Sequence, residues 1–439
     1  MTFADWKNYW KKIHWTRKWF PIFILLRPVS DNFYYLKKVS PLISPLYIMG
    51  VLLPILIFMS FKSKKFPGKL RSGVDEFMRI WGVAIFINCA VILFFQFSIE
   101  NFGNAIKYIS PPLVFFYARR FVQSKEDIMF ILQTFLYSCL FPFAMLSFET
   151  FVHPLNPEFV TEGRGGGYRV RGAYGDCMNY AIYIIGAMLI YSYFFLDKVY
   201  NYKVTKVKPS TIKMIGMFLI CLAGIMSIRH VSSWSVFIAI IVWLLVFNSK
   251  NVKGLVVVLF FVLIIGPFFA QSLYDHQIRP LIGKEINVMN GDADIQYSFN
   301  GRMSRWEKYF EIWSDMPVFM HVFGVSFSSI KEVPIMVGGG MHSDYVRMIF
   351  LSGIFGLVMY ILFLLMILRR KKYFKPPERF LILATLSSLV LYSVSTLPMI
   401  YMGYLNFILP VFAFALLPKW KAYPELNPAN NGNNTAALA

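Results

Sequence analysis

The sequence predicts an all-α, polytopic membrane bundle of about 12 transmembrane helices with two long loops on one side. Of the 439 residues, 57% are hydrophobic and only 15% are charged, against roughly 25% charged in an ordinary soluble domain. The apolar residues are also clustered into long runs without a charge, such as 255–269 and 357–368. A bilayer core of about 30 Å needs roughly 20 apolar residues per helix, so these runs predict membrane spans.

The bundle is expected at 19–418, between an initial segment and a tail. Segment 1–18 is basic and Trp-rich and has no small-residue cleavage site, so we expect it to rest on the cytoplasmic face of the membrane. The tail 419–439 is rich in Asn, Ala and Pro, which predicts a disordered cytoplasmic segment. The expected spans are 19–38, 43–61, 77–98, 102–118, 127–149, 178–197, 211–229, 231–248, 253–272, 346–368, 379–396 and 399–416. Arg27, Pro28 and Asp31 interrupt the first span, so it is either a full crossing or a broken, half-inserted helix.

Basic residues occur in five clusters, each between two spans, and twelve spans place all five on one side. The positive-inside rule makes that side cytoplasmic, and Lys37 and Lys38 are the exception. Topology and attraction to anionic lipid therefore account for the net charge of +21, and no nucleic-acid partner is expected. The clusters are Lys62/Lys64/Lys65/Lys69/Arg71, Arg119/Arg120/Lys125, Lys198/Lys203/Lys206/Lys208/Lys213, Lys250/Lys253 and Arg369/Arg370/Lys371/Lys372/Lys375.

Two long loops, at about 150–177 and 273–345, then lie on the opposite, periplasmic side. An arginine close to the hydrocarbon core of the membrane costs free energy and usually has an anionic partner. Its planar guanidinium group can donate two parallel hydrogen bonds to phosphate oxygens. One such arginine alone is explained by contact with lipid phosphate, whereas a convergent set indicates a diphosphate headgroup. The candidates are Arg164, Arg169 and Arg171 in the first loop, Arg229 after the span 211–229, and Arg302 and Arg305 in the second loop.

His342 precedes the span 346–368, at the periplasmic edge of the bundle (its rim), where these arginines are also expected. On a continuous helix, Gly353 would lie about 20° from His342 and Gly356 about 40° to the other side, on a stripe shared with Tyr345. Two glycines three residues apart let a neighbouring helix approach closely. A histidine at this rim can accept a proton from a hydroxyl group near neutral pH, and a purely structural histidine is the alternative. Asp344 and Glu307 are the next candidates for a base.

Other chemistry has no support in the sequence. It contains no HExxH helix, Walker loop or GxSxG elbow. Its four cysteines show no paired spacing typical of zinc sites or disulfides. We therefore expect no metal site and no cofactor.

One set of motifs resembles a known family. His342-Ser343, nine residues, Gly353, two residues and Gly356 resemble the signature of the O-antigen ligase and O-antigen polymerase superfamily. Arg171-Gly172 before a span, Arg229 with the Ser-Ser-Trp turn that follows, and Gly301-Arg302 with Trp306 and Gly324 are similar to further segments of that family. The resemblance covers roughly residues 165–365.

The resemblance implies a metal-independent, inverting glycosyltransferase in the bacterial inner membrane, with its active site on the periplasmic side. It implies an undecaprenyl-diphosphate-linked oligosaccharide as donor, a glycan acceptor, arginines that hold the diphosphate, and His342 as the base that activates the acceptor hydroxyl. Arg171 is the first choice among the first-loop arginines. A chain-length regulator is a further partner that the resemblance allows.

The acceptor separates two activities within this family. A polymerase transfers the glycan to another lipid-linked repeat unit of an O-antigen, capsule or exopolysaccharide, and a ligase transfers it to lipid A-core. His-Ser-Asp-Tyr followed by Arg347 is more similar to the polymerase branch, so we expect a polymerase, with a ligase as the alternative. A transporter or a non-catalytic glycolipid-binding protein is a second alternative, which the mostly charge-free central spans disfavour.

Overall fold

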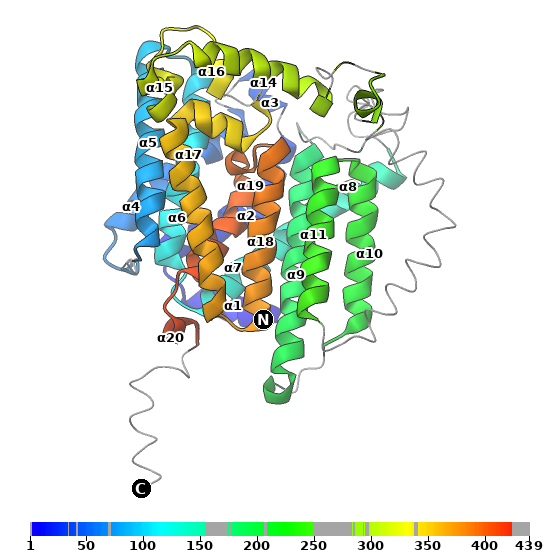
Figure 1. Ribbon diagram of the computed structural model, residues 1–439. Coiled ribbons are helices and arrows are strands. Elements are labelled where there is room, and N and C mark those ends of the chain that lie inside the picture. Colours follow the sequence, from blue (N-terminus) through cyan, green and yellow to red (C-terminus); the bar gives the residue numbers. More distant parts are fainter. Residues whose placement is uncertain are drawn as a thin grey trace.

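The computed structural model of the chain describes residues 2–33, 35–40, 43–68, 72–153, 170, 174, 177–205, 209–248, 283, 286–292, 294, 298–337 and 341–423. All regular structure within these ranges is helical (Figure 1). The first elements are α1 (Phe3–Lys12), α2 (Trp15–Asn32), α3 (Leu36–Val39), α4 (Pro45–Lys62), α5 (Val74–Phe95), α6 (Ile99–Phe121), α7 (Lys125–Ser138), α8 (Leu140–Phe151), α9 (Cys177–Thr205), α10 (Thr211–Ile228) and α11 (Val231–Phe247). The remainder are α14 (Ser298–Ser314), α15 (Val318–Phe323), η6 (Val325–Phe327), α16 (Val333–Val337), α17 (Asp344–Arg370), η8 (Lys371–Tyr373), α18 (Pro376–Ser395), η9 (Pro398–Ile400), α19 (Met402–Ala415) and α20 (Lys419–Ala422).

Seven helical segments are long and apolar enough to cross a membrane, which indicates a multi-pass membrane protein. They are α4, α5, α7 with α8, α9, α10, α17 and α18. The helices α11 and α19 are apolar but shorter, and α2 and α6 coincide with two further expected spans. The expected span 253–272 lies outside the described residues, so the total of twelve crossings stays a prediction.

Hydrogen bonds at one end of the bundle join the turns that carry basic residues. The Arg120 guanidinium donates to the carbonyl oxygens of Phe61, in the last turn of α4, and of Phe66 and Pro67, which follow it. The ammonium of Lys125 pairs with Asp197 at 2.8 Å and with Glu378 at 2.6 Å. The turns before α7 and α18 and the end of α9 therefore meet at this end, which is the lower end in Figure 1.

The first expected span, 19–38, contains two helices: α2 runs unbroken to Asn32, and the short α3 begins at Leu36. Helix α2 passes through both Pro21 and Pro28. Arg27 Nε lies 2.8 Å from Asp31 Oδ1, one helical turn away, and both side chains are largely buried. The two charges that interrupt this span in the sequence therefore neutralise each other within the helix.

Both terminal segments are packed more firmly than the sequence suggests. In α1, Trp6 Nε1 donates to Thr134 Oγ1 of α7 at 2.8 Å, and Tyr9 donates to Asp127. The expectation of a disordered tail from residue 419 is wrong for its first residues. They form α20, and the buried Tyr423 donates its hydroxyl to Glu378 at 2.9 Å. The rest of the tail, 424–439, lies outside the described residues.

Burial separates the centre of the bundle from its rim. In the most apolar 18-residue stretch of α9, 83% of the residues are buried inside the protein, against 17% in α4. Helix α9 is therefore central and α4 peripheral. Arg119, which the sequence groups with the loop charges, is instead fully buried and donates to Asp75 Oδ1 at 2.8 Å and to Ala413 O at 3.1 Å. A buried arginine needs such partners because its desolvation is expensive. The pair ties α5, α6 and α19 together.

Candidate active site

The end of α18 is the point at which the candidate residues meet. At Ser395, the last residue of α18, the carbonyl oxygen accepts a hydrogen bond of 2.7 Å from Arg302 Nη1 of α14. The Ser395 hydroxyl contacts the hydroxyl of Ser232, in the first turn of α11. Two segments that are far apart in the sequence, α14 and the α10–α11 turn, therefore converge on one residue at the upper end of the bundle (Figure 1).

His342 lies beside the same helix end. Ser343 Oγ donates to Ser393 O at 3.1 Å, and Asp344 N donates to Thr396 O at 3.2 Å. On the other side, Trp306 Nε1 of α14 donates to Met341 O at 2.7 Å. His342 is exposed between these two anchors and has a left-handed backbone, with φ of 50°. The segment thus presents the imidazole at the rim, where a substrate hydroxyl could reach it.

Arg229 has the same backbone conformation as His342. It is the C-cap of α10, with φ and ψ both 50°. Its Nη1 atom is buried and has no hydrogen-bond partner among the described residues. The next residues attach the turn to α18, because His230 Nδ1 lies 2.7 Å from Ser233 Oγ and Tyr392 OH donates to Ser233 Oγ at 2.9 Å. Arg229 therefore has a buried Nη1 group that lacks a partner among the described residues, and its turn is held next to the end of α18.

The remaining predicted site residues are not tied to the end of α18 by contacts like those of Arg302 and Ser343. Arg305 is exposed on α14, one turn from Arg302. Tyr345 does not extend toward the rim, because its hydroxyl donates to Val390 O at 3.3 Å, further down α18. Arg164, Arg169 and Arg171 lie outside the described residues. Val170, between the last two, is described and donates its backbone N–H to Ser227 O at 3.2 Å, two residues before Arg229.

The expectation that His342 and Gly353 share one helical face is wrong. Helix α17 begins only at Asp344 and is kinked at Gly353, whose φ of 67° and ψ of −178° are not helical. An ideal Cβ at Gly353 would lie 2.0 Å from Val322 O, so the absence of a side chain lets the end of α15 pack directly on α17. Residues at 100° per position share a face only along an unbroken helix, and α17 neither includes His342 nor continues regularly through Gly353. Close approach of a helix at this glycine is confirmed, and the partner is the end of the six-residue helix α15.

Gly324 makes the reciprocal contact. Its φ is 109°, and an ideal Cβ there would lie 2.6 Å from Leu351 O of α17. Asn88 of α5 closes the junction by donating Nδ2 to Phe323 O at 3.0 Å. Gly324 and Gly353, which belong to separate motifs in the sequence, thus allow α15 and α17 to pack in direct backbone contact.

Asp344 has a positioning role that the sequence did not reveal. It is fully buried and accepts hydrogen bonds from Arg347 Nη2 at 2.6 Å and Met399 N at 3.0 Å. Ser393 Oγ lies 3.4 Å away. Through these hydrogen bonds the Asp344 carboxylate holds the start of α17 against the end of α18, next to His342. Because it is buried and already hydrogen-bonded, it is not accessible as a base. Glu307, the other alternative base, is exposed on α14.

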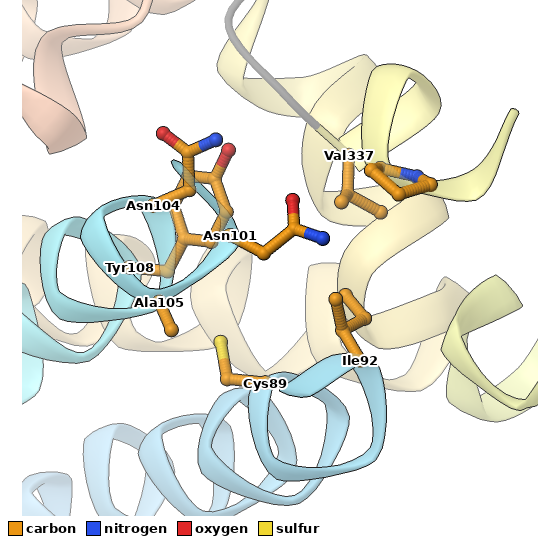
Figure 2. Close-up of a pocket in the computed structure, with 8 residues that line it drawn as sticks. Cys89, Ile92, Asn101, Asn104, Ala105, Tyr108 and Val337 are labelled. Atoms are coloured by element: carbon orange, nitrogen blue, oxygen red, sulfur yellow. The ribbon is translucent and has the colours of Figure 1, made fainter. Parts of the chain in front are cut away.

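Arg347 connects this cluster to a small pocket of mixed polar and apolar lining between α5, α6 and α16. The guanidinium carbon lies 4.9 Å from the centre of the Tyr108 ring. Figure 2 shows Tyr108 with Asn101, Asn104 and Cys89 around the pocket, which Val337 borders. The signal for this pocket was present in the sequence, because Asn101, Asn104 and Tyr108 have the three- and four-residue spacing of one helix face.

Within the described ranges, no group of three or more His, Cys, Asp or Glu side chains could hold a metal ion. Comparison with protein-family models, with characterised proteins and with solved structures gives no match for this chain.

Proposed function

We propose that this protein is a membrane glycan polymerase. In this proposal it transfers an undecaprenyl-diphosphate-linked oligosaccharide onto a hydroxyl of another lipid-linked repeat unit. The observation that supports it best concerns Arg229 and His342. Among the residues that the structure describes, they are the two non-glycine residues with a positive φ. Strained backbone persists where the surrounding structure enforces it, often at functional sites.

The convergence of Arg229, Arg302 and His342 supports the division of roles. A glycosyl diphosphate develops negative charge on its phosphate oxygens as the sugar–oxygen bond breaks. Guanidinium groups held at that position stabilise this charge without reorganisation. Arg229 has a buried N–H group with no partner among the described residues, and Arg302 is anchored at Ser395. These arginines would hold the leaving group, together with the first-loop arginines that flank Val170.

His342 would take the proton from the acceptor. The buried contacts of Ser343 and Asp344 fix its backbone, while its side chain is exposed at the rim. General-base assistance of this kind contributes about 10²–10⁴-fold to a rate. Attack by the activated hydroxyl from the face opposite the diphosphate inverts the anomeric centre, and the diphosphate lipid leaves.

The test is a transfer reaction with the purified protein in liposomes. The donor is the undecaprenyl-diphosphate-linked glycan extracted from cells that carry the gene, and lipid A-core is added to a parallel sample. The proposal expects longer glycans on the lipid carrier, and expects Arg302→Ala to lose this activity while Lys308→Ala, an exposed site on the same helix, keeps it. Glycan appearing only on lipid A-core would identify a ligase. No glycan transfer in either sample would contradict an enzymatic role.

A further inference from the structure

The segment from Val318 to Phe327, which forms α15 and η6, is short, apolar and bounded by polar residues. Ser314 and Asp315 precede it and Ser328 and Ser329 follow it. Apolar stretches of about 10–14 residues are too short to span a bilayer and occur as buried, interfacial or re-entrant segments. Several of its side chains are exposed, which excludes full burial in the protein: Val318 is 74% exposed, Phe319 52% and Phe323 43%.

Contacts of this segment place it beside the interior of two membrane spans. Phe323 O accepts its hydrogen bond from Asn88, seven residues before the end of α5, which corresponds to roughly 10 Å along the helix. Val322 and Gly324 pack against Gly353 and Leu351, which lie within α17 and not at its start. In Figure 1, α15 accordingly lies next to the upper part of α5.

The exposed face of α15 continues the lipid-facing surface of these two spans. On α17, Ile354 and Val358 are 47% and 42% exposed, and Phe355 packs against Phe323 with 6.0 Å between ring centres. On α5, Phe86 and Phe94 are exposed. Exposed apolar side chains on membrane-spanning helices face acyl chains, so the same environment extends without interruption onto α15.

Two polar groups within the segment have partners in the protein, whereas the buried Ser326 hydroxyl has none among the described residues. The imidazole Nε2 of His321 lies 2.6 Å from Trp313 O, and its ring lies over the Trp313 ring. The N–H of Gly324 donates to Met320 O at 2.9 Å, within the same turn. Irregular backbone is tolerated in the hydrocarbon region only where protein contacts of this kind satisfy it.

We propose that α15 and η6 form a re-entrant membrane segment, which dips into the lipid beside α5 and α17 and returns at Ser328. The partner is the hydrocarbon of the adjacent leaflet, and Phe319 and Phe323 are the side chains that enter it. The segment anchors the C-terminal end of α14 at the membrane surface, and Arg302 lies near the other end of that helix. This inference does not depend on the proposed enzymatic activity.

The experiment measures the environment of a nitroxide label in the full-length protein in phosphatidylcholine–phosphatidylglycerol liposomes. Labels are attached to Phe319→Cys, to Val358→Cys as a lipid-facing reference, and to Glu311→Cys as an exposed reference on α14. The four native cysteines are buried, and the unsubstituted protein treated in parallel gives the background signal. Collision rates with oxygen, which concentrates in lipid, are compared with those of a water-soluble nickel complex.

The expected ratio of oxygen to nickel collisions at position 319 matches that at 358 and exceeds that at 311 several-fold. Val318→Cys, at the most exposed apolar position of α15, is measured as well and replaces Phe319→Cys if that variant does not elute as a folded protein. A ratio at 319 equal to that at 311 would show that the segment lies in water. Low collision rates with both reagents would show that a protein partner or a second copy covers this face. Either result would overturn the proposal.

Discussion

Replacement of Gly353 by alanine tests the packing that holds α15 and α14 over the site. The backbone there has φ of 67° and ψ of −178°, a region that costs a side-chain-bearing residue about 1–3 kcal/mol. The new Cβ would lie 2.0 Å from Val322 O and 2.3 Å from Val322 C, so backbone atoms must move. Overpacking of this kind typically costs a further 1–3 kcal/mol or so. Gly353→Ala should therefore lower the free energy of unfolding by about 2–6 kcal/mol.

Gly216→Ala is the matched control. Gly216 lies within α10, and an ideal Cβ there meets nothing within 4 Å. Alanine at such a helical position should stabilise the protein by about 0.5–1 kcal/mol. Thermal unfolding of both variants in detergent, followed by loss of the monodisperse peak after heating, measures the difference. If Gly353→Ala unfolds at the same temperature as Gly216→Ala, the close contact between α15 and α17 does not exist as described.

Three further predictions concern the candidate site and the topology. Arg302→Ala should lower glycan transfer roughly ten- to hundredfold, because a charge-assisted hydrogen bond contributes about 1.5–3 kcal/mol. Arg302→Lys should restore little of the activity, because the ammonium group cannot make the bidentate contact of a guanidinium. Equal rates in the wild-type protein and both variants would remove Arg302 from the site. Arg229→Gly should stabilise the unliganded protein by about 1 kcal/mol, since glycine is favoured at a left-handed helix C-cap, and it should weaken donor binding. Lower thermal stability with unchanged donor binding would indicate that Arg229 has a structural role. Cysteines introduced at Gly166 and Asn290 should react with an impermeant maleimide added outside whole cells, and those at Lys65 and Lys371 should not; labelling at Lys371 would reverse the orientation.

The spans could be predicted because their signal is local. A bilayer selects runs of apolar residues, and within the described ranges each expected run overlaps a helix or, at 19–38 and 127–149, two consecutive helices. The sequence could not show which charges lie inside the bundle. Arg119 belongs to a basic cluster and is nevertheless buried, because its partner Asp75 is contributed by another helix.

The residues of the candidate site could be selected from the sequence, but their geometry could not. Arg229, Arg302 and His342 could be selected because their residue types suit a diphosphate and a base at one rim, and the structure brings their segments to the end of α18. The helical face through His342 was predicted wrongly, because the backbone freedom of Gly353 breaks the periodicity on which that prediction rested. The pair of Asp344 and Arg347 is local in the sequence, but its burial and its contacts with Met399 and Tyr108 could not be predicted, because those residues lie far away in the sequence.

We propose that His342 acts as the base in glycan transfer while the arginines bind the donor. His342→Gln tests it most directly, because glutamine keeps the hydrogen-bonding capacity and most of the volume but cannot accept the proton. We expect transfer by His342→Gln to fall by about 10²–10⁴-fold, with unchanged binding of the lipid-linked donor in a liposome pull-down. A His342→Gln protein that extends the glycan at the wild-type rate would contradict the account, and His342 would then be a packing or hydrogen-bonding residue at the rim.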